Sequence, residues 1–124
     1  MNAPRVLIVE DDAVIAMALE MFLEELGAQV VAVAGNVQDA LQKATCEDFD
    51  LAFLDINLNG QKAHVLPSVL ERRHKPFAFV TGYGEQGVLG AHADAPVVAK
   101  PFSRGAISTA LEKLKGRLSA TPSA

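Results

Sequence analysis

Cysteine is nearly absent from this sequence of 124 residues, which contains a single one, Cys46. One thiol cannot form an internal disulfide, and it cannot supply the several sulfur ligands of a cysteine-based zinc site. Free cysteines are among the residues most often buried in folded proteins. We therefore expect Cys46 to be a buried or half-buried structural thiol.

Clusters of positive charge are also missing. The longest uninterrupted run of Lys or Arg is the pair Arg72 and Arg73, and the formal net charge is −4. Nucleic acids and anionic membranes attract proteins through clustered Lys and Arg side chains. The sequence therefore argues against nucleic acid and against a membrane surface as partners.

Long hydrophobic runs are absent too. No segment approaches the roughly 20 consecutive apolar residues of a transmembrane helix, and the N-terminus lacks the pattern of a signal peptide. We expect a cytoplasmic protein. Apolar residues still make up 50% of the chain, which is enough for one core. We predict one domain over residues 1–118 and a disordered tail over residues 119–124, without a DNA-binding output domain.

Short apolar runs alternate with segments of helical periodicity along the whole chain. The predicted strands are Arg5–Val9, Gln29–Val33, Leu51–Leu54, Phe77–Val80 and Val97–Ala99. The predicted helices are Ala13–Leu26, Val37–Ala44, Ala63–Arg73 and Arg104–Leu118, with Asp12 and Asn36 as N-caps and Gly27 as a stop. This alternation indicates an α/β fold, a doubly wound parallel sheet covered by helices on both faces.

Two helical segments contain residues that disfavour a regular helix. Between the last two strands, Gly84, Gly87 and Gly90 each cost about 1 kcal/mol relative to Ala in a helix interior. We expect a weak and mobile helix there. Pro67 lies inside the third predicted helix, where we expect either a kink or a late start.

Polar side chains follow four of the predicted strands, at the sheet edge where open α/β sheets bind their ligands. These are Glu10 and Asp11 after the first strand, Asp55 after the third, Thr81 after the fourth and Lys100 after the fifth. Three carboxylates at one edge repel one another, and a divalent cation removes that repulsion. All the available ligands are hard oxygens, so we predict Mg²⁺.

This set of side chains suits phosphoryl transfer. A metal-bound carboxylate beside a lysine and a hydroxyl can accept a phosphoryl group, because the transfer depends mostly on positioning and on neutralising charge. In this scheme Asp55 is the nucleophile and the Lys100 ammonium pairs with one phosphoryl oxygen. The Thr81 hydroxyl donates a hydrogen bond to another oxygen.

Over essentially its whole length the chain resembles a response-regulator receiver domain. Four motifs carry the resemblance: Leu7-Ile8-Val9-Glu10-Asp11, Phe53-Leu54-Asp55-Ile56-Asn57, Val80-Thr81-Gly82 and Ala99-Lys100-Pro101-Phe102. The resemblance implies a flavodoxin-like sheet with strand order 2-1-3-4-5 and five helices. It also implies two-component signalling, in which a sensor histidine kinase phosphorylates Asp55 in the presence of Mg²⁺.

The resemblance assigns further roles to residues around Asp55. Asp11 is implied as a direct metal ligand, Glu10 as a ligand through water, and the backbone carbonyl of Asn57 as a third protein ligand. Asp12 matches no metal position. A cis peptide bond before Pro101 is implied as well, which would aim Lys100 into the site.

One position departs from the family pattern. Many receivers carry an aromatic switch residue three positions before the lysine, where this chain has Val97. The run Phe79-Val80-Thr81-Gly82-Tyr83 resembles the FATGUY subgroup, which tends to pair with kinases of the HWE or a related type. We hypothesise that Tyr83 takes over some of the switching or shields the acyl phosphate from water. Phe102 is a second switch candidate.

The way the phosphoryl group is used stays open, as do two other function classes. Without an output domain, the chain would switch a partner protein, relay the group to a phosphotransfer protein or act as a phosphate sink. A phosphohydrolase of the haloacid-dehalogenase type would need a second acid two residues after the nucleophile, where this chain has Asn57. A pseudo-receiver adaptor would keep the fold without phosphotransfer.

Overall fold

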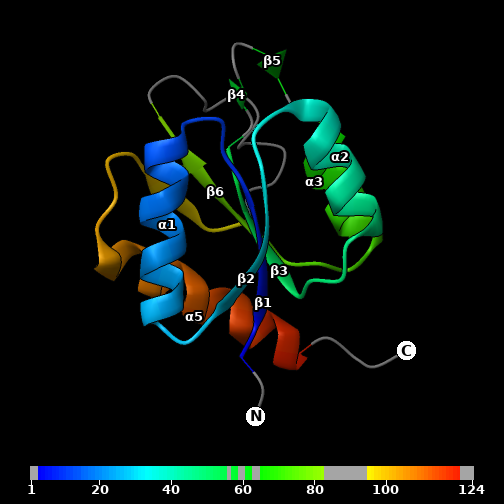
Figure 1. Cartoon of the computed structure of the whole chain (residues 1–124). Coiled ribbons are helices and arrows are strands. Elements are labelled where there is room, and N and C mark those ends of the chain that lie inside the picture. Colours follow the sequence, from blue (N-terminus) through cyan, green and yellow to red (C-terminus); the bar gives the residue numbers. More distant parts are fainter. Residues whose placement is uncertain (1–2, 56, 59–60, 63–64, 83–94, 121–124) are drawn as a thin grey trace.

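The computed structural model describes the chain except residues 1–2, 56, 59–60, 63–64, 83–94 and 121–124 (Figure 1). Five parallel strands form one sheet in the order β2-β1-β3-β6-β7. They are β1 (Arg5–Val9), β2 (Gln29–Ala34), β3 (Leu51–Leu54), β6 (Phe77–Thr81) and β7 (Val97–Ala99). The predicted strand order and the doubly wound fold are confirmed.

The part of the chain that the structure describes contains four helices. They are α1 (Ala13–Glu25), α2 (Val37–Cys46), α3 (Val65–Arg72) and α5 (Arg104–Ala120). Helices α1 and α5 cover one face of the sheet, and α2 and α3 cover the other (Figure 1). The weak helix predicted around Gly84, Gly87 and Gly90 lies outside the described residues. Among the described helices, none has the length and apolar character needed to span a bilayer.

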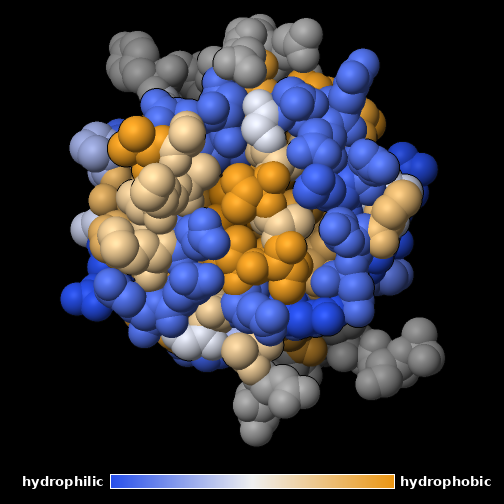
Figure 2. Space-filling view, viewed as in Figure 1, coloured by the Kyte–Doolittle hydropathy of each residue, from blue (hydrophilic) through white to orange (hydrophobic). Residues whose placement is uncertain are grey.

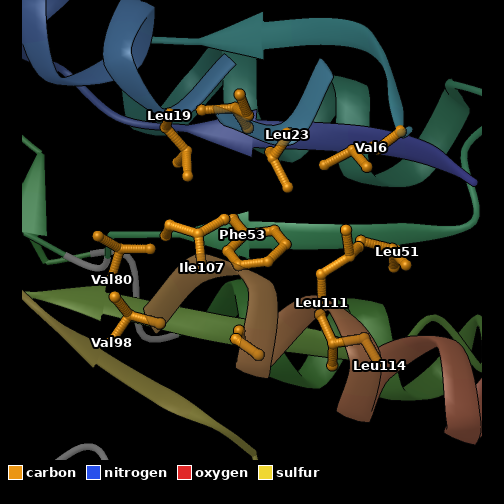
Figure 3. Close-up of a cluster of buried hydrophobic side chains, with 14 residues drawn as sticks. Val6, Leu19, Leu23, Leu51, Phe53, Val80, Val98, Ile107, Leu111 and Leu114 are labelled. Atoms are coloured by element: carbon orange, nitrogen blue, oxygen red, sulfur yellow. The ribbon is translucent and has the colours of Figure 1, made fainter. Parts of the chain in front are cut away.

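Each face of the sheet packs against its own pair of helices. Alternate side chains of a strand point to opposite faces, so Leu54 joins one core and Phe53 the other. Figure 3 shows Leu19 and Leu23 of α1 opposite Leu111 of α5, with Phe53 between them. All residues of β3 are buried because helices cover both faces and strands flank both edges. This burial fixes the position at which Asp55 leaves the strand.

The predicted helix signals at the ends of α1 and α2 are confirmed. Asp12 accepts hydrogen bonds from the backbone of α1, and the Asn36 side chain accepts one from Asp39 N–H at 2.8 Å. Gly27 ends α1 with a φ of +94°, a left-handed conformation that glycine adopts without steric cost. A non-glycine residue, His74, takes the same role after α3 with a φ of 58°.

Helix α3 and the segment before it differ from the sequence prediction. The described part of α3 begins at Val65, two residues before Pro67, and residues 63–64 lie outside the description. The kink or late start at Pro67 therefore stays a prediction. The short antiparallel strands β4 (Asn57–Leu58) and β5 (Gln61–Lys62) were not predicted. The sequence between them, Asn59-Gly60, is a strong hairpin signal that could have revealed them.

Cys46 is exposed, so the prediction of a buried or half-buried thiol is wrong. Helix α2 packs on the core through Ala40 and Ala44. At 3.6 residues per turn, each residue is rotated by about 100° from the last, so Cys46 points about 200° away from Ala44. At the other end of the chain, α5 continues past Leu118 to Ala120, and residues 121–124 lie outside the description.

Candidate functional site at the carboxyl edge of the sheet

The carboxyl ends of four strands bring the predicted site residues to one edge of the sheet. Three of them donate a backbone hydrogen bond to the neighbouring strand. Glu10 N–H donates to Ala34 O at 2.9 Å, and Asp55 N–H donates to Val9 O at 2.9 Å. Lys100 N–H donates to Thr81 O at 2.8 Å. The sheet thus fixes the backbone of each residue one position beyond the strands.

Three carboxylates gather at this edge. One oxygen from each of Glu10, Asp11 and Asp55 lies within 4.8 Å of the others. Glu10 is 3% exposed, Asp55 5% and the neighbouring Thr81 6%, so these polar side chains are buried at the end of the sheet. Asp12 is excluded from the group, because its Oδ1 accepts N–H groups of α1 at 2.9 and 3.2 Å. Its role as an N-cap explains the third acid of the run.

Lys100 bridges two of the carboxylates. Its Nζ donates a hydrogen bond to Asp55 Oδ2 at 2.8 Å and lies 2.7 Å from Glu10 Oε1 in an ion pair. Only 18% of the Lys100 side chain is exposed, so water screens these contacts weakly. The Lys100–Pro101 peptide bond is cis, as the resemblance implies.

Burial and the neighbouring charges shift the pKa in opposite directions, both for Glu10 and for Lys100. Burial raises the pKa of Glu10, and this effect outweighs Lys100 and the Asp12 N–H, which donates to Glu10 Oε2 at 3.0 Å. Burial lowers the pKa of Lys100, but its hydrogen bond with Asp55 and its ion pair with Glu10 prevail, so the pKa is raised. One ammonium therefore faces three carboxylates, and the site retains an excess of negative charge.

This donor set fits a magnesium ion. The three carboxylates are hard oxygen ligands, which Mg²⁺ prefers. Glu10 Oε1 is buried, and among the described residues it accepts no aligned hydrogen bond despite the nearby Lys100 Nζ. A buried acceptor in that state can act as a ligand, directly or through water. The Asn57 carbonyl, which lies in β4, stays a predicted ligand.

The structure describes one of the two switch candidates, Phe102, and not the other, Tyr83. Tyr83 lies outside the described residues. Phe102 is half-buried and packs edge-to-face on Phe22 of α1, with 6.0 Å between the ring centroids and 75° between the ring planes. Val97 begins β7 and is 51% exposed. Phe22 was not predicted as part of the site, because nothing in the spacing of α1 links it to a residue so distant in the chain.

Comparison with known proteins places the whole arrangement among signalling proteins. A family model described as the response regulator receiver domain matches residues 6–112. The solution structure of SdrG from Sphingomonas melonis Fr1 is 36% identical with a TM-score of 0.77, covering 94% of this chain and 96% of SdrG. The BeF3-activated conformation of SdrG from Pseudomonas melonis Fr1 is 39% identical with a TM-score of 0.75, covering 92% and 98%.

Relatives with longer chains match as well. The sensory transduction protein LytR of Staphylococcus haemolyticus is 31% identical over 119 residues, which are 93% of this chain and 46% of LytR. This chain spans about half the length of the curated relatives it matches, with 46% and 55% as examples. The similarity to LytR therefore concerns one part of that protein.

Proposed function

Because this chain belongs to the response regulator receiver family, we propose that it is the phosphoryl-accepting module of a two-component system and that Asp55 is the acceptor. One observation carries the assignment. Asp55 is a buried carboxylate at the end of a central strand, with an ammonium on Oδ2 and two further acids close by. A structural salt bridge needs no such excess of negative charge, whereas a site for a metal and a phosphoryl group does.

The chain's own side chains divide the work of transfer. A carboxylate oxygen of Asp55 attacks phosphorus as the bond to the donor atom breaks, and the electron pair of that bond leaves with the donor. The Lys100 ammonium, already at the Asp55 carboxylate, pairs with a phosphoryl oxygen, and the Thr81 hydroxyl donates to another. Bound Mg²⁺, held by Glu10, Asp11, Asp55 and the Asn57 carbonyl, would supply further neutralisation of the phosphoryl oxygens.

We propose a sensor histidine kinase as the phosphoryl donor, and an HWE-type kinase in particular on the basis of the sequence run Phe79 to Tyr83. An apolar surface near the site supports a protein partner. Val14, Met17 and Met21 follow one stripe of α1 and are 75%, 65% and 52% exposed. Figure 2 shows apolar surface over α1 and over the edge strand β2. Contiguous exposed apolar side chains commonly mark protein interaction sites.

Intact-protein mass spectrometry after incubation with acetyl phosphate and Mg²⁺ tests the proposed acceptor. The wild type is expected to gain one phosphoryl group, and Asp55→Asn is expected to gain none. Asp12→Asn is the matched control, because Asn caps a helix as well as Asp does and Asp12 lies outside the carboxylate group. A full gain of mass in Asp55→Asn would refute the assignment of Asp55.

The two rival functions give different results in the same preparation. Continued release of phosphate from a generic phosphate ester would favour a phosphohydrolase. A wild type that accepts no phosphoryl group from acetyl phosphate or from its kinase would favour the pseudo-receiver adaptor. The Lys100 contact and the three acids favour phosphoryl acceptance over the pseudo-receiver adaptor. Asn57, at the position where the phosphohydrolase needs a second acid, favours it over the phosphohydrolase.

A further inference from the structure

The Lys100 ammonium reaches the carboxylates from a short connection between β7 and α5. The N-terminal side of this connection is fixed by the sheet, since Lys100 N–H donates to Thr81 O at 2.8 Å. On the C-terminal side, Ser103 precedes α5, and its Oγ accepts a hydrogen bond from Ala106 N–H in the first turn at 3.1 Å. Between them, Phe102 is the large apolar side chain that can tie the connection to the body of the protein.

Phe102 ties this connection to α1. Its ring packs edge-to-face on Phe22 at 6.0 Å, and both rings lie against the core under α1 and α5. The second link between α1 and the start of α5 is polar and exposed: Arg104 Nη1 lies 2.7 Å from Glu25 Oε1. Exposed ion pairs constrain geometry weakly, so the aromatic pair is the stronger of the two links.

Helix α1 also positions the other end of the lysine contact. Asp12, the N-cap of α1, donates its backbone N–H to Glu10 Oε2 at 3.0 Å. The remaining oxygen of Glu10 lies 2.7 Å from Lys100 Nζ. One rigid helix thus determines where Glu10 points and, through Phe22 and Phe102, where the backbone after Lys100 runs.

We propose that Phe102 is a positioning residue, whose packing on Phe22 holds the Lys100 ammonium at Asp55 in the geometry that phosphoryl transfer needs. This inference rests on the proposed function of Asp55. A lysine side chain has four rotatable bonds, so its ammonium is placed accurately only if the backbone beneath it is fixed. A displacement of about 1 Å at a reacting group can slow a reaction by about 100-fold. We expect a slowing of about 10-fold when the aromatic contact is lost, because the sheet still holds Lys100 N–H.

The rate of phosphorylation of Asp55 by acetyl phosphate and Mg²⁺ tests this role. Phe102→Ala is expected to react about 10-fold more slowly than the wild type, Phe102→Tyr to react at nearly the wild-type rate, and Phe102→Leu to fall between them. Arg104→Ala is the matched control, because it removes the exposed link between the same two helices. A Phe102→Ala rate within about twofold of the wild type would overturn the inference while leaving Asp55 as the acceptor.

A double-mutant comparison separates positioning from general damage to the fold. In a Lys100→Met background, Phe102→Ala has no ammonium left to misplace, so it should slow the reaction by less than about twofold. An equal slowing in both backgrounds would show that Phe102 acts on the fold as a whole and would refute the proposal. Absence of phosphorylation in the wild type itself would instead reject the proposed function.

A readout independent of activity covers the case in which Lys100→Met reacts too slowly to measure. The ammonium nitrogen resonance of Lys100, identified by its disappearance in Lys100→Met, reports directly on the contact with Asp55 and Glu10. It should shift in Phe102→Leu, which keeps most of the apolar volume, and stay in place in Arg104→Ala. An unchanged resonance in Phe102→Leu and Phe102→Ala would refute the positioning role.

Discussion

Replacing Lys100 by Met tests the charge balance of the site most directly. The substitution keeps the apolar stem of the side chain and removes the ammonium, which lies 2.8 Å from Asp55 Oδ2 and 2.7 Å from Glu10 Oε1. The Glu10 and Asp55 side chains are only 1% and 7% exposed, so water cannot replace the lost partner well. Three carboxylates would then face one another without a cation.

The expected cost follows from the burial of these groups. Removing one partner of a buried ion pair destabilises proteins by about 3 to 5 kcal/mol. The Lys100 side chain keeps 18% of its surface exposed, so we expect the lower end, about 3 kcal/mol near pH 7. For a domain of this size that corresponds to a fall in Tm of roughly 10 °C. A cation present at 100 times its Kd for the folded state stabilises that state by about 2.7 kcal/mol.

Thermal unfolding in EDTA and in a Mg²⁺ series measures both effects. Lys100→Met should lose stability in EDTA and gain more from Mg²⁺ than the wild type does, because the lysine no longer competes with the cation. Lys115→Met is the matched control, since Lys115 forms an ion pair with the exposed Glu112. A loss below about 0.5 kcal/mol, equal to that of the control, would refute the account of the site as an excess of buried negative charge.

Four further predictions follow from other parts of the structure. Arg73 Nη1 donates to the carbonyl of Ala44 in α2 at 2.5 Å and to that of Glu47, the C-cap of α2, at 3.2 Å, and its guanidinium lies over the Phe49 ring. Arg73→Ala should therefore cost about 2 kcal/mol in urea unfolding, against less than about 0.5 kcal/mol for Arg72→Ala, whose side chain is exposed. Gly27→Ala should lower the free energy of unfolding by about 1 kcal/mol because φ is +94°, although the new Cβ would meet nothing within 4 Å. Gly116→Ala inside α5 should raise it by about 1 kcal/mol. Changes of the same sign in both variants would contradict this reasoning. The raised pKa of Glu10 means that its neutral form stabilises the fold, and this contribution declines as pH rises from about 4.5 through the folded pKa. In EDTA, the stability of Glu10→Gln should therefore exceed that of the wild type increasingly over that window, and a constant difference would count against it. Met17→Glu on the apolar stripe of α1 should slow phosphoryl transfer from the kinase but leave the rate with acetyl phosphate unchanged. Gln42→Glu on α2 is the control. Equal rates of transfer from the kinase to Met17→Glu and to the wild type would exclude α1 from the contact.

Much of the fold could be predicted because composition changes sharply at the strand ends. The bounds of β1, β3 and β7 coincide with the predicted strands, since each apolar run stops at a polar or charged residue. In a parallel sheet those stopping points meet at one edge, so the proximity of Glu10, Asp11, Asp55 and Lys100 followed from the strands alone. The prediction of a common site needed no knowledge of side-chain packing.

Some features could not be predicted from the sequence because they depend on contacts between residues far apart in the chain. Arg73 caps α2 from a position 29 residues beyond Ala44, and local periodicity carries no signal for such a contact. The exposure of Cys46 could have been predicted by following the rotation of α2 past Ala44. Strands β4 and β5 have two residues each, too few for an alternating pattern to stand out. There the Asn59-Gly60 dipeptide was the usable signal.

The position of Lys100 shows how a site predicted from strand ends still depends on packing elsewhere. The sheet places the backbone of Lys100 beside Thr81, but the ammonium could lie anywhere within the reach of a flexible side chain. Its contact with Asp55 exists because α1 orients Glu10 at one end and, through Phe22, holds Phe102 at the other. Many receivers have an aromatic switch where this chain has Val97. Among the described residues, the pair Phe22 and Phe102 is an aromatic contact between α1 and the connection that carries Lys100. A change at Asp55 that draws Lys100 toward a phosphoryl oxygen would therefore act on α1, the helix that carries the exposed apolar stripe.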